Sequence, residues 1–224
     1  MKLLLSDRGF TLTEILVAMV ISSMVMGGIY STFYSQQKSY ATQDQVVVMQ
    51  QNLRAAMYLM EREIRMVGFD PTGGAGAGIE PVSQSTIRIR TDFTDNSGTG
   101  GPDGDTGDTG EDIIYALSDV DADGDTDLVR NDVNGAGIEM LAENIDAVDF
   151  VYLDKDGGET TNASDIRSVQ ISLVARSNRP DRGYHDTTVY RNQAGDNIYE
   201  PSASDNYRRR MLSAEVMCRN LGLE

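Results

Sequence analysis

The chain has 224 residues, which is enough for one domain of ordinary size and an appendage. Its formal charge of -16 disfavours a general nucleic-acid-binding protein, whose surface is basic. With one cysteine, Cys218, and one histidine, His185, it can form no intramolecular disulfide and offers little basis for a zinc site or a Ser/His/Asp triad. The acidic excess is local, because eleven Asp and one Glu, but no Lys or Arg, lie between Arg90 and Arg130.

The N-terminal segment combines a basic start with a long apolar stretch. Lys2 and Arg8 precede twenty-three uncharged residues, 15–37, and about twenty such residues span a bilayer. The positive residues predict a cytoplasmic N-terminus and a chain that continues outside the membrane. No A-x-A cleavage site of a secretory signal follows Tyr30. We therefore expect residues 10–37 to stay with the protein as a transmembrane helix.

The helical pattern continues beyond this stretch. Apolar residues recur at spacings of three and four, the period of one helix face, at Val46, Met49, Leu53, Met57, Met60, Ile64 and Val67. Gly68 and Pro71 are typical helix stop signals. The pattern predicts an amphipathic helix over residues 38–70 that packs against a globular head.

The stretch "RGFTLTEILVAMV", which begins at Arg8, resembles the class III signal of type IV pilins and type II secretion pseudopilins. In that signal a short basic leader ends in Gly and is followed by Phe, by Glu at the fifth mature position and by an apolar helix. The resemblance implies a leader of residues 1–9, cleavage by a prepilin peptidase between Gly9 and Phe10, and N-methylation of Phe10. The apolar helix would lie first in membrane lipid and later in the core of a filament.

The resemblance also implies a role for Glu14. A carboxylate inside a membrane segment is costly and is usually retained for a function. In pilins this Glu is thought to pair with the N-terminal amine of an adjoining subunit and to set the axial register during assembly. The alternative is a carboxylate near the cytoplasmic interface that has no such role.

Two further stretches resemble PilW-like minor pilins. The helix after the apolar stretch carries an Asn-x-Arg step and an Arg-Met-x-Gly-aromatic ending, at Asn52, Arg54, Arg65, Met66, Gly68 and Phe69. The segment "YRRRMLSAEVMCRNLGL" resembles the last strand of the same family. The resemblance implies a minor pilin, not an enzyme, that acts in pilus assembly or priming near the tip.

The same resemblance implies a location and partners. The protein would lie in the bacterial inner membrane with its N-terminus cytoplasmic and its head outside, and then in the cell-surface pilus. Its partners would be the prepilin peptidase, other minor and major pilins and the inner-membrane assembly platform, whereas nucleic acid is disfavoured. Two alternatives stay open: a PulJ-like minor pseudopilin of a type II secretion system, and an adhesive binding module displayed at the tip.

Residues 71–224 predict a β-rich head. Strand-like patterns occur in residues 85–93, 112–117, 147–154, 167–177 and 212–218. In the last three, alternate residues form one apolar face: Val148, Phe150, Tyr152, Val169, Ile171, Leu173, Ala175, Leu212, Ala214, Val216 and Cys218. We expect an α+β, pilin-like fold in which the long N-terminal helix, with a transmembrane half and an amphipathic half, packs on an antiparallel β-sheet.

An acidic, Gly- and Asp-rich insertion is expected over residues 92–130. Its Asp119, Asp121, Asp123, Asp125 and Asp127 fit the start of a D-x-D-x-D-G calcium loop. An EF-hand is disfavoured because its position twelve is Arg130 and no flanking helices are indicated. A looser calcium turn, with a contribution from Asp103, Asp105 or Asp108, is one alternative, and a solvated hairpin is the other. We expect that the protein requires no cofactor, and calcium is the only ion that the sequence suggests.

Three other features receive structural interpretations. The run Arg208, Arg209 and Arg210 is expected to flank an edge strand or to pair with the acidic insertion, although it could also bind acidic surfaces. Cys218 is expected to be a small core residue. His185 is expected to have a structural or surface role because the sequence shows no neighbour that would orient its imidazole.

Overall fold

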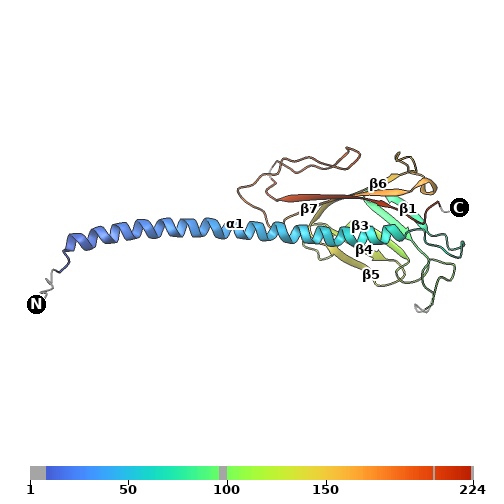
Figure 1. The fold of residues 1–224 in the computed structure, drawn as a ribbon, viewed down its shortest axis with the longest axis horizontal. Coiled ribbons are helices and arrows are strands. Elements are labelled where there is room, and N and C mark those ends of the chain that lie inside the picture. The colour runs from blue at the N-terminus through green and yellow to red at the C-terminus, as the bar shows by residue number, and fades with distance from the viewer. Residues whose placement is uncertain (1–8, 96–99, 204, 223–224) are drawn as a thin grey trace, which may run out of the picture. The chain divides into compact units, whose positions relative to one another are not determined.

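The structure is a computed structural model that describes residues 9–95, 100–203 and 205–222 (Figure 1). Its first element, α1 (Leu12–Met66), is a single helix of 55 residues. Internal contacts divide the chain into two units, one up to Asp44 and one from Gln45 onward, which we call the head. The helix therefore contributes to both units.

The head contains two antiparallel sheets and a short hairpin. One sheet has five strands in chain order: β1 (Gly78–Ser83), β2 (Thr86–Arg90), β3 (Asp112–Ser118), β4 (Asp127–Asp132) and β5 (Gly137–Ala142). The other has three strands in the order β10 (Arg209–Met217), β7 (Ser168–Arg176) and β6 (Ile145–Leu153). The remaining elements are the hairpin of β8 (Tyr190–Arg191) and β9 (Asn197–Tyr199) and a 3-10 turn, η1 (Ala163–Asp165).

The head part of α1 and both sheets share one core, and Figure 1 shows this part of the helix running across them. The predicted helix face is confirmed, since Val46 is half-buried and the other residues of the stripe are buried. Isoleucines of β2 and β3 meet this face from the first sheet, and the alternating residues of β6, β7 and β10 meet it from the second. Apolar burial on this scale is what holds helix and sheets together.

The end of α1 is held by the chain on two sides. Gly68 follows the helix with a φ of 77°, the left-handed conformation of a helix C-terminal cap. Its N–H donates to the carbonyl oxygen of Arg90 at 3.2 Å. The side-chain amide of Asn220 donates to the carbonyl oxygen of Met66 at 3.0 Å. The predicted stop at Gly68 is therefore confirmed, and it joins the helix end to β2 and to the C-terminal segment.

The five expected strands are present as β2, β3, β6, β7 and β10, but the expectation of one sheet is wrong. The two sheets separate after β5, where the chain turns at Asn144 with a φ of 60°. Alternation of apolar residues reveals strands but does not reveal which strands pair. Five strands were also missed: β1, β4, β5, β8 and β9.

The predicted acidic insertion, residues 92–130, is not one continuous loop. Strand β3 and the start of β4 lie inside residues 92–130, and Ile113 and Leu128 in them are core residues. The acidic residues therefore fall mainly in two separate loops. One precedes β3, and the other is the turn between β3 and β4, which pair up to Ser118 and Asp127.

Candidate functional site

The start of α1 is a capping box built by Thr11 and Glu14. The backbone N–H of Thr11 donates to Glu14 Oε2 at 2.8 Å, and the Thr11 hydroxyl donates to the same oxygen at 2.8 Å. In return, the N–H of Glu14 donates to Thr11 Oγ1 at 3.3 Å. This reciprocal pair satisfies two backbone donors that a helix start otherwise leaves free, and the carboxylate lies at the positive end of the helix dipole.

The capping box adds a role for Glu14 within its own chain, which the sequence interpretation does not include. The pairing of Glu14 with an adjoining subunit stays a prediction. The signal was present in the sequence, because Thr-x-x-Glu directly before an apolar run is the pattern of a capping box. A carboxylate oxygen has lone pairs to spare, so the cap is compatible with a further contact from outside.

Gly9 and Phe10 lie just before this cap. Neither belongs to the helix, and both are exposed, Phe10 with 85% of its surface accessible. The peptide bond between them is therefore in an irregular, accessible stretch, which is the kind of segment that proteases cleave.

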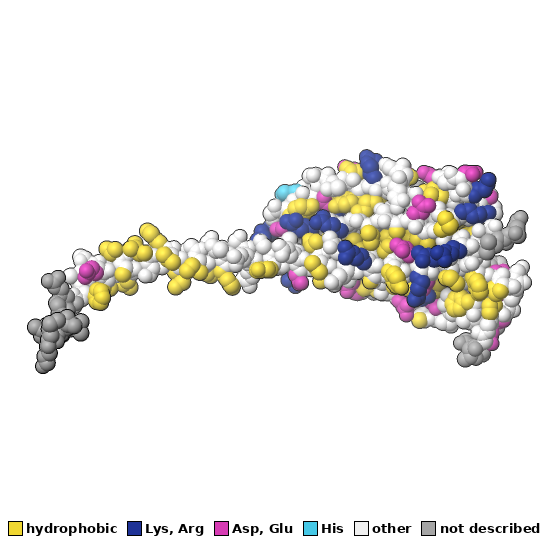
Figure 2. All heavy atoms as spheres, viewed as in Figure 1, with side chains coloured by type: hydrophobic (Ala, Val, Ile, Leu, Met, Phe, Trp, Pro, Cys, Tyr) yellow, Lys and Arg dark blue, Asp and Glu magenta, His cyan; other side chains and the backbone are white. Residues whose placement is uncertain are grey.

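The first part of α1 carries apolar side chains all round, and Figure 2 shows them along the helix. Residues 9–41 are all exposed, among them Ile15, Leu16, Val20 and Met24. This helix is long and apolar enough to cross a membrane by length and composition. So much uncovered apolar surface is unusual in a soluble monomer and marks a lipid-facing or protein-facing surface.

The second candidate site, the acidic turn between β3 and β4, divides its five aspartates. Carboxylate oxygens of Asp119, Asp121 and Asp123 lie within 4.8 Å of one another, and all three side chains are exposed. Asp125 accepts from Arg176 Nη2 at 2.7 Å. Asp127 is buried and accepts the N–H of Asn144 at 3.1 Å. The turn therefore groups three of the five aspartates closely enough to hold one ion, and calcium binding there stays a prediction.

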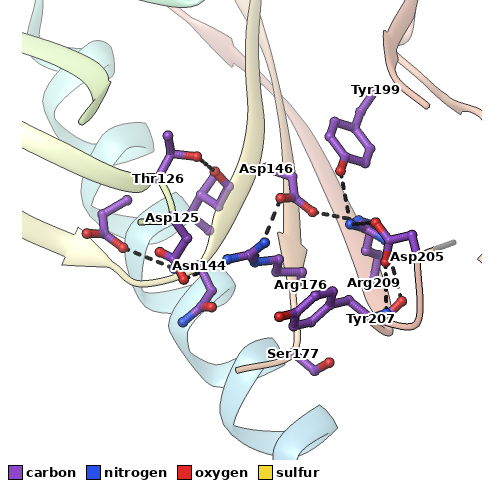
Figure 3. A network of polar contacts seen from close by, with 12 residues as sticks. Asp125, Thr126, Asn144, Asp146, Arg176, Ser177, Tyr199, Asp205, Tyr207 and Arg209 are labelled. Atoms are coloured by element: carbon purple, nitrogen blue, oxygen red, sulfur yellow. Dashed lines mark hydrogen bonds and ion pairs between the residues drawn. The ribbon is translucent and has the colours of Figure 1, made fainter. Parts of the chain in front are cut away.

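Arg176 and Arg209 form the centre of a polar network shown in Figure 3, and the side chain of Arg209 is only 1% exposed. Arg209 contacts Asp146 at 2.5 Å and Asp205 at 2.6 Å, and its Nη2 donates to the Tyr199 hydroxyl at 2.9 Å. Burial opposes its charge, but the hydrogen bonds to Asp205 and Asp146 raise the pKa of Arg209 above its usual value. The network joins β6, β7 and β10 to the long segment before β10.

The three consecutive arginines therefore have different environments. β10 is an edge strand of its sheet, so the expectation that the run flanks an edge strand is confirmed. Pairing with the acidic insertion is wrong, because Arg208 binds Asp181 at 2.8 Å and Arg209 binds aspartates outside residues 92–130. Arg210 is exposed. Aspartates of the insertion pair instead with Arg88, at Asp112, and with Arg176, at Asp125.

Cys218 and His185 have the environments that the sequence indicates. Cys218 is 2% exposed in the main core, and burial raises the pKa of its thiol to about 12. A thiol with so high a pKa is a core residue and not a nucleophile. His185 is exposed on the surface of the head.

Comparisons with known proteins find family models that match two parts of the chain. Residues 5–30 match the prokaryotic N-terminal methylation motif, and residues 137–220 match the type IV pilus-assembly protein W family. The curated proteins gave no match. Among solved structures, the type IV-like pilin TTHA1219 from Thermus thermophilus is similar, with a TM-score of 0.45 and 16% identity over 77% of this chain and 97% of that chain. By these two matches, the chain is similar to prepilins over residues 5–30 and to the pilus-assembly protein W family over residues 137–220, and each matched stretch is less than half of the chain.

Proposed function

We propose that the chain is a PilW-like minor pilin that acts in the assembly or priming of a type IV pilus and occupies a position near its tip. The observation that carries the proposal is the uncovered apolar part of α1, most of which lies inside the matched methylation motif of residues 5–30. Such a surface needs lipid before assembly and neighbouring helices afterwards, because water cannot cover it without cost. The inner membrane, with the N-terminus cytoplasmic and the head outside, supplies the first environment, and other minor and major pilins supply the second.

Deletion of the gene tests the role in the filament. Loss of surface pili, restored by the wild-type gene, is the expected result for an assembly or priming subunit. Normal pili with lost attachment would contradict the proposal and favour an adhesive module. Normal pili with a defect in protein secretion would favour a type II secretion pseudopilin.

The proposed processing places a cut by prepilin peptidase between Gly9 and Phe10, followed by N-methylation of Phe10. Gly9→Leu should leave the leader attached, which N-terminal sequencing and mass spectrometry of the purified protein measure directly. Gly27→Leu is the matched control, since Gly27 lies in the same segment and a side chain there meets nothing within 4 Å. Processing of Gly9→Leu to a chain that begins at Phe10 would contradict the proposed cleavage.

Glu14 is proposed to pair, in the assembled filament, with the new amine of Phe10 in an adjoining subunit. An acidic residue at the membrane centre costs roughly 2.5–3.5 kcal/mol on insertion scales, and an amine at the same depth would offset that cost. The capping box offers a second reason for Glu14, because it supports the helix start within one chain. The two roles require different chemistry, which makes them separable.

Glu14→Gln separates the cap from the charge. A glutamine at this helix position can still accept the N–H of Thr11, so the capping box persists while the negative charge is lost. Thr11→Ala does the opposite: it weakens the cap by about 1 kcal/mol and keeps the charge. We expect Glu14→Gln to be cleaved normally but to be depleted from sheared pili, and Thr11→Ala to be incorporated. Normal incorporation of Glu14→Gln would show that the carboxylate serves only the cap.

A further inference from the structure

The loop before β3 is held in place by two carboxylates that are completely buried, Asp92 and Glu111. Asp92 accepts the N–H groups of Asp103 and Gly104, each at 3.1 Å. Glu111 accepts the N–H groups of Phe93 and Thr94, each at 2.8 Å. Backbone donors therefore compensate both charges, and the loop has a fixed attachment at each end.

Within this loop, Asp103, Asp105 and Asp108 converge. One carboxylate oxygen from each lies within 4.8 Å of the other two. Calcium binds oxygens at about 2.3–2.6 Å, so two ligands on opposite sides of one ion are about 5 Å apart. The three oxygens are therefore close enough to share a single ion.

Asp108 is the residue that points to a ligand. It is only 8% exposed, and its Oδ2 has no hydrogen-bond partner among the described residues. A buried carboxylate surrounded by carboxylates is unfavourable unless a cation compensates it.

The arginines near this loop pair with other carboxylates. Arg88 and Arg90 contact Asp112, and Arg130 contacts Asp132, whereas none of the ion pairs among the described residues includes Asp108. The loop contacts the turn after β4, where the Asn134 amide donates to the carbonyl oxygen of Thr106 at 3.2 Å. That contact is neutral and leaves the charge of Asp108 uncompensated.

We propose that Asp103, Asp105 and Asp108 form a calcium-binding site in the head. Their hard carboxylate oxygens suit this ion, and calcium tolerates the irregular coordination of a loop better than magnesium does. The site differs from the predicted one in the turn between β3 and β4. There, Asp125 is already paired with Arg176, and the grouped aspartates Asp119, Asp121 and Asp123 are all exposed.

Calcium titration of the full-length chain in detergent micelles, after removal of metal with EDTA, tests the site. The test variant is Asp105→Asn/Asp108→Asn, and the matched control replaces Asp119, Asp121 and Asp123 by Asn. Isothermal titration calorimetry with calcium chloride should show saturable binding to the wild type, with a Kd on the order of 10⁻⁴ to 10⁻³ M. The test variant should bind at least about tenfold more weakly, and the control should keep this site.

A single variant guards against a folding defect. Asp105→Asn changes an exposed side chain and keeps an acceptor for the N–H of Gly107, which lies 2.7 Å from Asp105 Oδ1. It should fold normally by circular dichroism and bind calcium more weakly. Unchanged affinity in this variant, loss of binding in the control alone, or no saturable binding by the wild type at about 10 mM calcium would each overturn the proposal. Calcium binding is measured apart from pilus incorporation, so this test is independent of the proposed function.

Discussion

Replacement of Arg209 by Met is expected to destabilise the head strongly. The side chain of Arg209 is 1% exposed and lies among Asp146, Asp186 and Asp205, whose side chains are 11%, 0% and 11% exposed. Methionine fills much of the same space but brings no charge. Asp146 would then keep an ion pair with Arg176, 3.9 Å away, whereas Asp186 and Asp205 would keep none of the ion pairs seen among the described residues.

The magnitude follows from the desolvation of these carboxylates. Removal of one partner from a buried ion pair costs about 3–5 kcal/mol, because an uncompensated charge is left behind. Arg210→Met is the matched control on the same strand, since Arg210 is exposed and donates to the carbonyl oxygen of Arg209 at 3.2 Å. Its cost should stay within about 0.5 kcal/mol.

Urea unfolding of both variants, followed by circular dichroism, measures the difference in unfolding free energy. The cost of Arg209→Met should also shrink as the pH falls from 7 to 5. Without Arg209 the folded-state pKa values of the carboxylates rise above their unfolded values, so the folded variant takes up protons first and is stabilised by acid. A cost below about 1 kcal/mol at pH 7, or one that grows on acidification, would refute the assignment of Arg209 as the compensating charge.

Two further substitutions test other parts of the head. Gly68→Ala should lower the unfolding free energy by about 2–3 kcal/mol, since the residue has a φ of 77° and an added Cβ would lie 2.4 Å from Leu221 Cδ2. Gly73→Ala, with a φ of 71° and open space around the Cβ, should lower it by about 1 kcal/mol. Equal losses for the two variants in urea unfolding would contradict this reasoning. Burial raises the pKa of Asp149 despite a hydrogen bond from Asn192. The ionised carboxylate therefore lowers the stability of the head at pH 7, and this destabilisation disappears as the pH falls through the folded-state pKa. Asp149→Asn should therefore have a higher unfolding free energy than the wild type at pH 7, and the difference should shrink in acid. A difference that grows in acid would contradict the raised pKa of Asp149.

The helix and β2, β6, β7 and β10 could be predicted because apolar residues recur at the spacing of one face, and β3 could be predicted because it is a short apolar run. Val169, Ile171 and Leu173 alternate in β7 and all lie in the core, as their spacing indicates. The missed strands lack this pattern. Strand β1 contains Pro81, which argues against a strand, and β4 alternates poorly because it ends in Arg130, Asn131 and Asp132.

The burial of Arg209 could not be predicted from its neighbours, because three consecutive arginines are typical of a surface. The second face of its sheet is covered by the segment before β10, where Tyr190 packs on Val174 and Ala147. The sequence of β7 indicates that both faces of this sheet are covered. Val174 interrupts the alternation of apolar and polar residues and forms an apolar run with Leu173 and Ala175. A strand with such a run is buried on both faces.

The acidic groups of this chain are stabilised in different ways, and the difference decides where a ligand is expected. Glu14 and Asp92 accept backbone N–H groups, so their charges are compensated by the peptide chain itself. Asp205 is compensated by a buried arginine, and contacts with Arg209 help lower the pKa of this carboxyl below its usual value. Asp108 is buried and has an oxygen without a partner among the described residues. Compensation for the first three comes from within the chain, whereas for Asp108 it has to come from outside, and a divalent cation is the simplest source.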